Sequence, residues 1–150
     1  MIVKPETLEQ ELLDMQQDFA FDTMGLTFNR LIPQTVIDSF NGKIFNLHLS
    51  LLPAFPGFGA TRKALESGLP YTGVTVHFVD AGIDTGPVIA QKRVAIRESD
   101  SPATLGRRQF ETAVPLLLHT VRMLESGRVL TFDEPDPELV EFGAQYCRQF

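Results

Sequence analysis

The sequence has little of what several protein classes require. Cys147 is the only cysteine in 150 residues, so an internal disulfide is excluded and a reduced cytosolic thiol is the simplest interpretation. No apolar run approaches the roughly 20 residues that a membrane-spanning helix needs. The first residues contain no basic region followed by a hydrophobic stretch, so we expect no signal peptide and a cytoplasmic location.

Basic residues are also scarce. Lys and Arg total 13 against 19 Asp and Glu, which gives a formal net charge of −6 and a pI of about 5.0. Because this balance lacks the basic footprint of nucleic-acid-binding proteins, we expect no nucleic-acid partner, and the lack of a membrane-spanning run likewise leads us to expect no membrane partner. Hydrophobic residues make up 43% of the chain, which is enough for a single domain over residues 1–150 with a sizeable core.

A Gly-rich phosphate loop after an N-terminal strand is missing as well. The only G-x-G is Gly57-Phe58-Gly59, which lacks the third glycine of a dinucleotide-binding motif. Hydrophobic periodicity and turn residues nevertheless predict an α/β fold with a mainly parallel, Rossmann-like sheet flanked by helices. The predicted helices span 5–17, 33–41, 60–68 and 101–127, and the predicted strands span 19–24, 43–48, 72–79 and 88–94. An acidic C-terminal tail with a last helix is predicted over 133–150.

The longest predicted helix has clear signals at both ends. Ser101 can act as its N-cap, Pro102 suits its first position, and Gly127 ends it. Helical spacing predicts a buried apolar stripe made of Leu105, Val114, Leu117, Leu118, Val121 and Leu124.

Two polar residues, Asn46 and His48, interrupt the apolar strand over 43–48. Residues two apart point to the same face of a strand, so these side chains should lie together. They also lie at the carboxyl end of the strand, where open α/β sheets bind their ligands. An amide donor beside an imidazole suits the stabilisation of an oxyanion and the transfer of a proton. Spacing alone also fits a satisfied structural pair, so both interpretations stay open.

Asp84 is a third candidate, because it lies in a tight loop between Gly82 and Gly86. A carboxylate held there could orient His48 or accept a proton. An Asp between two glycines is also a common turn former.

Three segments in this order resemble the folate-dependent formyltransferases, namely 46–57, 72–79 and 84–89. The family pattern is Asn-x-His-x-Ser-Leu-Leu-Pro, then a Thr-Gly strand, then an Asp-x-Gly turn. The similarity extends over residues 18–130, and the glycinamide ribonucleotide branch of the family is the most similar. The formyltransferase fold is therefore the expected one.

The resemblance implies formyl transfer between small molecules, from 10-formyltetrahydrofolate to an amine, with no metal. It leaves the acceptor open, with glycinamide ribonucleotide of purine biosynthesis as one candidate. By this resemblance Asn46 and His48 stabilise the oxyanion, and His48 also serves in proton transfer. Asp84 then assists His48 and helps to remove the proton of the attacking amine. The same resemblance assigns folate binding to Arg30, Leu31, Ile32, Val79, Asp80 and Asp84. His77 is left as either a folate contact or a satisfied core histidine.

The chain departs from the family at its start. Members normally carry further strand–helix units there, including a phosphate loop for the ribonucleotide, so an N-terminally truncated fold is expected. A fragment, a natural truncation and a homodimer that completes its sheet remain open explanations. Two alternative functions also remain open: hydrolysis of the same donor, as in the deformylases, and a non-catalytic domain that binds folate or a partner.

Overall fold

The computed structural model describes residues 7–19, 23–27, 30–41 and 43–126. The acidic tail predicted over 133–150 lies outside the described residues. The elements in chain order are α1 (Leu8–Phe19), β1 (Met24–Leu26), α2 (Gln34–Ser39), β2 (Ile44–His48), α3 (Ala60–Glu66), β3 (Tyr71–Phe78), β4 (Val88–Ala95) and α4 (Pro102–Glu125). The four described strands form one sheet in the order β1-β2-β3-β4, which confirms the α/β class.

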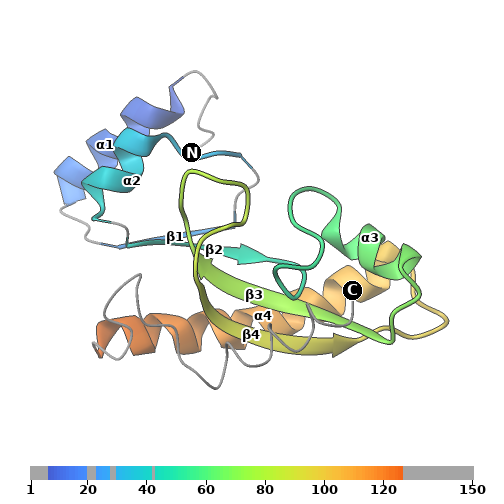
Figure 1. The fold of residues 1–150 in the computed structure, drawn as a ribbon. Helices are drawn as coiled ribbons and strands as arrows, with labels where there is room; N and C mark the ends of the chain where they lie inside the picture. Colours follow the sequence, from blue (N-terminus) through green and yellow to red (C-terminus); the bar gives the residue numbers. More distant parts are fainter. Residues whose placement is uncertain (1–6, 20–22, 28–29, 42, 127–150) are drawn as a thin grey trace.

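The direction of the strands corrects the expectation of a mainly parallel sheet. Only β1 and β2 run parallel, while β2–β3 and β3–β4 are antiparallel pairs. A parallel pair needs a crossover that brings the chain back to the end of the sheet where the first strand began, and α2 provides one between β1 and β2. By contrast, α3 packs against α4 and β3 at one end of the sheet (Figure 1). The chain therefore enters β3 from the end where it left β2.

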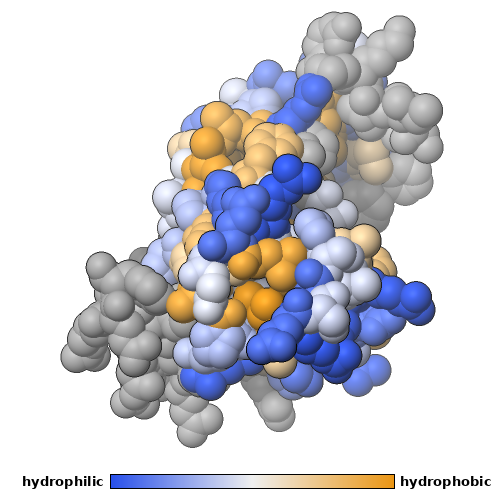
Figure 2. Space-filling model, turned by 90° about the vertical axis from the view of Figure 1, so that its right-hand side faces the viewer, coloured by the Kyte–Doolittle hydropathy of each residue, from blue (hydrophilic) through white to orange (hydrophobic). Residues whose placement is uncertain are grey.

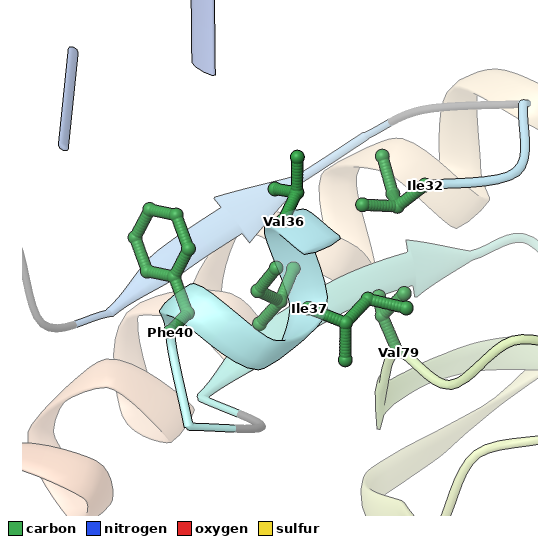
Figure 3. Packing of buried hydrophobic residues seen from close by; sticks show 6 residues of the cluster. Ile32, Val36, Ile37, Phe40 and Val79 are labelled. Atoms are coloured by element: carbon green, nitrogen blue, oxygen red, sulfur yellow. The ribbon is translucent and has the colours of Figure 1, made fainter. Parts of the chain in front are cut away.

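Helices cover both faces of the sheet. On one face, α1 and α2 pack against β1 and β2. Figure 3 shows Val36 and Ile37 of α2, with Phe40 directly after it, in a buried cluster with Ile32 and Val79. On the other face, α4 runs beneath β3 and β4 (Figure 1). Its residues pack against a second cluster, which consists of Phe45, Val76, Phe78 and Ile89. The β2–β3 pair of the sheet therefore lies between two packed helical layers.

The first strand was placed wrongly by the sequence prediction. Of the strand expected over 19–24, Phe19 is the last residue of α1 and Met24 is the first residue of β1, while residues 20–22 lie outside the described residues. Gly25, which was expected to end the strand, is its central residue. A Cβ at Gly25 would lie 2.8 Å from the ring of Phe45 on the paired strand, so a glycine at this position makes room for that ring.

The buried stripe of α4 was predicted only in part. Leu105 is fully buried and Leu117, Val121 and Leu124 pack on the core, but Val114 and Leu118 are 42% and 57% exposed. The helix instead turns small or polar side chains toward the sheet. These fully buried residues are Gln109, Ala113 and Thr120. A small or hydrogen-bonded residue lets the helix approach the sheet closely, which hydrophobic spacing alone does not indicate.

The start of α4 is fixed by capping and by an ion pair. The Ser101 hydroxyl accepts a hydrogen bond from the Thr104 amide, and the Thr104 hydroxyl accepts one from the Ser101 amide, a reciprocal cap. Arg108, one turn further, donates to both oxygens of Asp100 and to the carbonyl of Ala95. These Arg108 hydrogen bonds hold the pKa of the Asp100 carboxyl well below its usual range. The helix start is therefore tied to the end of β4.

None of the helices in the described part of the chain is both long and apolar enough to cross a membrane. Seen from the side of α3, hydrophobic side chains reach the surface in separate patches between hydrophilic ones (Figure 2).

Two glycines should respond to alanine with opposite signs. A Cβ at Gly86 would lie 1.9 Å from the carbonyl oxygen of Phe78, whereas a Cβ at Gly106 on α4 meets only a methyl group of Thr61 at 3.9 Å. Gly86→Ala should lower the free energy of unfolding by at least about 2 kcal/mol, because the backbone carbonyl of Phe78 cannot move aside as the end of a side chain can. Gly106→Ala should raise it by about 0.5–1 kcal/mol through helix propensity. Urea unfolding followed by circular dichroism measures both, and equal effects would contradict the prediction.

Candidate active site

Asn46 and His48 lie together on one face of β2, as their spacing predicts. Both side chains are largely buried, with 7% and 8% of each residue exposed. The register of the β2–β3 pair sets Asn46 opposite His77 and His48 opposite Thr75. Cross-strand partners share a face of the sheet, so β3 adds His77 to the polar group that β2 begins.

His48 is held on both sides of its ring. Its Nε2 donates to the carbonyl of Phe55 at 2.9 Å, and its Nδ1 lies 3.2 Å from Oδ2 of Asp84. The first contact fixes the ring plane, since a carbonyl oxygen can only accept. The second becomes an ion pair when the imidazole is protonated. Because both ring nitrogens have a partner within the protein, a ligand that takes the Nε2 proton of His48 must first displace the Phe55 carbonyl.

Asp84 occupies a backbone conformation that few residues adopt. Its φ is 54°, a left-handed value that Asp and Asn tolerate better than most side chains. The Gly57 amide donates to Oδ2 of Asp84 at 2.7 Å. Within the same loop, Asp80 accepts hydrogen bonds from the Gly82 amide and the Thr85 hydroxyl. The turn-forming role and the side-chain contacts of Asp84 therefore coexist.

His77 joins the same group from β3. Its Nδ1 donates to the carbonyl of Phe78 at 2.7 Å, and its Nε2 lies 3.5 Å from Oδ1 of Asp84. Only 2% of the residue is exposed. Burial lowers the pKa of His77, and the Phe78 carbonyl and the charge of Asp84 oppose that effect only in part. The structure thus brings two imidazoles to one carboxylate.

The lowered pKa of His77 predicts a pH dependence of stability. The unfolded chain takes up a proton near pH 6.5 while His77 in the folded chain stays neutral, so the free energy of unfolding should fall as the pH drops from 7 through 6.5 toward the folded-state pKa. His77→Gln cannot take up this proton and should show a shallower decline in that window. Urea unfolding at pH values between 7 and 5 measures the difference. An equal or steeper slope for the variant would count against this assignment, and His119→Gln, which removes an exposed histidine of α4, is the control.

These residues form one wall of a cavity of about 390 Å³. Every residue assigned above to folate binding lines it, as do Asn46, His48 and His77. Five further residues line the cavity that the sequence analysis did not name individually as folate contacts: Leu26, Gly57, Phe58, Gly82 and Ile83. Phe58 and Ile83 are 70% and 59% exposed. Each is a large apolar residue next to a glycine in a loop, and this pattern could have indicated a ligand contact from the sequence.

The arrangement of the cavity suits a particular chemistry. An amide and an imidazole on one strand can donate to a developing oxyanion, and the carboxylate behind the imidazole can stabilise its charged form. Exposed apolar side chains that also line the cavity, including Leu31 and Ile83, suit a flat, partly hydrophobic ligand. In the described part of the chain, no group of three His, Cys, Asp or Glu side chains is arranged to hold a metal ion.

A profile of the formyl transferase family matches residues 3–121. The chain belongs to the formyl transferase family. Phosphoribosylglycinamide formyltransferase of Bacillus subtilis (strain 168) is 43% identical over 101 residues, which are 67% of this chain and 52% of that protein. The chain spans about half the length of the curated relatives it matches in this branch.

Solved structures of formyl transferases share the fold. Phosphoribosylglycinamide formyltransferase from Bacillus halodurans superposes with a TM-score of 0.76 at 35% identity, over 89% of this chain and 69% of that one. A formyltetrahydrofolate deformylase from Pseudomonas syringae pv. tomato gives a TM-score of 0.81 at 25% identity, over 88% of this chain and 45% of that one. The sheet and its helices therefore match solved structures of proteins with different named activities.

Proposed function

We propose that this formyl transferase takes the formyl group of 10-formyltetrahydrofolate and transfers it to an amine, with glycinamide ribonucleotide of purine biosynthesis as the acceptor. The observation that carries the proposal is the convergence of Asn46, His48 and Asp84 on one wall of the cavity. The similarity to phosphoribosylglycinamide formyltransferases adds the choice of acceptor.

The proposed reaction has two bond changes. The amine nitrogen attacks the formyl carbon, and the carbonyl oxygen becomes an oxyanion that receives hydrogen bonds from Asn46 and His48. The bond from the formyl carbon to N10 of the folate then breaks, and N10 takes a proton from His48. Asp84 accepts, through a water molecule, the proton that the attacking amine loses, and then passes a proton to the ring of His48, so that both residues end as they began. The products are a formamide and tetrahydrofolate, so atoms and charges balance.

The cavity fits the donor in size and character. Small-molecule sites usually enclose about 300–1,000 Å³ and combine apolar walls with a few polar groups. The proposed folate contacts follow that pattern, with Leu31, Ile32 and Val79 as apolar walls and with Arg30 and Asp80 as polar ones. Because Arg30 is exposed at this rim, it is available to an anionic part of the donor.

Hydrolysis of the same donor is the second candidate, favoured by the superposition on the deformylase. In that reaction water takes the place of the amine, and formate is released. A single assay distinguishes the two functions. Tetrahydrofolate is followed with the donor alone and with the donor plus glycinamide ribonucleotide.

The outcomes of that assay separate all three hypotheses. Tetrahydrofolate that forms only with the amine, together with formylated product, supports transfer. Formate that appears without any amine supports hydrolysis and overturns the proposal. If a folate analogue binds in calorimetry and neither assay shows turnover, the result supports the third hypothesis, a non-catalytic folate-binding domain.

We propose further that residues 1–150 act as one domain in the cytoplasm on small molecules, and that two copies associate through the edge strand β1. In the described sheet β1 has a partner on one side only, and an open parallel edge can accept another strand. Sedimentation equilibrium tests this association, and a monomer at micromolar concentration would contradict it.

A further inference from the structure

Gln109 is an unusual residue for the centre of a helix that packs on a sheet. It lies two turns into α4, within the interior of the helix, and none of its surface is exposed. A buried amide is costly unless each of its polar atoms has a partner. Its partners therefore indicate what the residue is for.

All the hydrogen-bonding groups of the Gln109 amide are used. Nε2 donates to the carbonyl of Leu49 at 2.8 Å and to the carbonyl of Gly73 at 3.0 Å. Oε1 accepts from the hydroxyl of Thr61 at 2.7 Å. Because two acceptors meet the nitrogen and one donor meets the oxygen, only one orientation of the amide satisfies the site. Such a network is strong in a buried setting and fixes the positions of its members.

Two of these partners mark the two ends of one loop. Leu49 directly follows His48 at the end of β2, and Thr61 is the second residue of α3. The chain between them, residues 50–60, supplies two contacts to the candidate site. The Phe55 carbonyl accepts from His48, and the Gly57 amide donates to Asp84. One side chain of α4 thus ties down both ends of the segment that fixes the imidazole and the carboxylate.

We propose that Gln109 is a positioning residue for the His48–Asp84 pair. It acts through the loop and touches neither the cavity nor the reacting atoms. The kinetic part of this proposal rests on the proposed function, while its geometric part does not. A displacement of about 1 Å at a reacting group can cost on the order of a hundredfold in rate, so a residue that fixes this loop has a measurable effect on turnover.

The first residues of the loop, Ser50 to Leu52, are also held by contacts that do not involve Gln109. Thr75 donates to the carbonyl of Ser50 and accepts from the amide of Leu52, and Gln91 donates to the carbonyl of Leu52. Loss of Gln109 therefore leaves the loop folded and changes where its ends lie. The effect we expect is a shift in geometry rather than unfolding.

The test uses Gln109→Met, which keeps the length of the side chain and removes all three hydrogen bonds. Thr120→Val is the matched control, because Thr120 is equally buried on α4 but donates only to Leu116 of its own helix. Amide hydrogen exchange of Gly57 reports the loop, and that of Val76 in the core of β3 reports global opening. Gln109→Met should speed exchange at Gly57 by about tenfold beyond any change at Val76, and Thr120→Val should not.

Kinetics supply the second readout. In Gln109→Met we expect kcat to fall by about ten- to a hundredfold, while KM for the folate donor stays within about threefold, because the folate-side residues are not bonded to Gln109. Equal acceleration at Gly57 and Val76, or a kcat like that of Thr120→Val, overturns the proposal. If Gln109→Met does not fold, Thr61→Val is used instead, because it removes only the hydrogen bond from Thr61 to Gln109. The exchange rate of Gly57 relative to that of Val76 then tests the proposal. If the wild-type chain shows no turnover, the proposed function fails while the exchange data still decide the role of Gln109.

Discussion

His48→Ala should lower kcat for formyl transfer by about 10²–10⁴-fold, because one side chain supplies both an oxyanion donor and a proton. The ring of His48 lies between the Phe55 carbonyl and Asp84, and no neighbouring donor occupies that place in alanine. The initial rate of tetrahydrofolate formation measures the loss. The effect should fall on kcat, since the apolar walls of the folate cavity are unchanged.

His119→Ala is the matched control for this variant. His119 lies on the exposed face of α4, so its removal should leave the rate within about twofold, as expected for a surface substitution. A His48→Ala protein that unfolds at the wild-type urea concentration and still turns over at the wild-type rate would remove His48 from the mechanism.

Asp84→Asn should reduce kcat/KM by about 10²–10⁴-fold, the range typical of a lost general base. Asparagine has the same shape and tolerates the left-handed φ of 54° at this position. Its side-chain oxygen can still accept from the Gly57 amide, so the loop keeps its anchor. What disappears is the negative charge that pairs with His48 and accepts the proton of the amine.

The control for this charge is Asp38→Asn, which alters an exposed carboxylate of α2. Steady-state rates for the two variants are compared with urea midpoints measured in parallel. If Asp84→Asn retains the activity of Asp38→Asn, the carboxylate has no part in proton transfer, and the assignment of Asp84 is wrong.

The residues proposed for chemistry were largely accessible from the sequence. Asn46 and His48 share a strand face by simple alternation, and the resemblance to formyltransferases added Asp84 before any geometry was known. The cap of α4 was likewise predictable, because Ser101 and Pro102 are local signals. Such features depend on residues that are close in sequence, and local rules describe them well.

The features that were missed depend on contacts between distant segments. The carbonyl of Phe55 and the amide of Gly57 fix the site, yet backbone groups are the same in every residue and leave no mark in a sequence. Gln109 interrupts the apolar pattern of α4, and its partners lie 60, 48 and 36 residues away. The direction of β3 followed from where α3 packs, which is a property of the tertiary structure.

The antiparallel register of β2, β3 and β4 has a consequence for the order in which the chain folds. The groups that meet at Asp84 all come from residues 46–84, a continuous segment. Their approach needs only the closure of the connection between β2 and β3 and of the turn before β4, which costs less loop entropy than contacts between distant segments. We therefore expect this three-stranded unit to form early and the short parallel strand β1 to join later. The polar centre of the site would then exist before the apolar walls contributed by Leu26, Leu31 and Ile32 close the cavity.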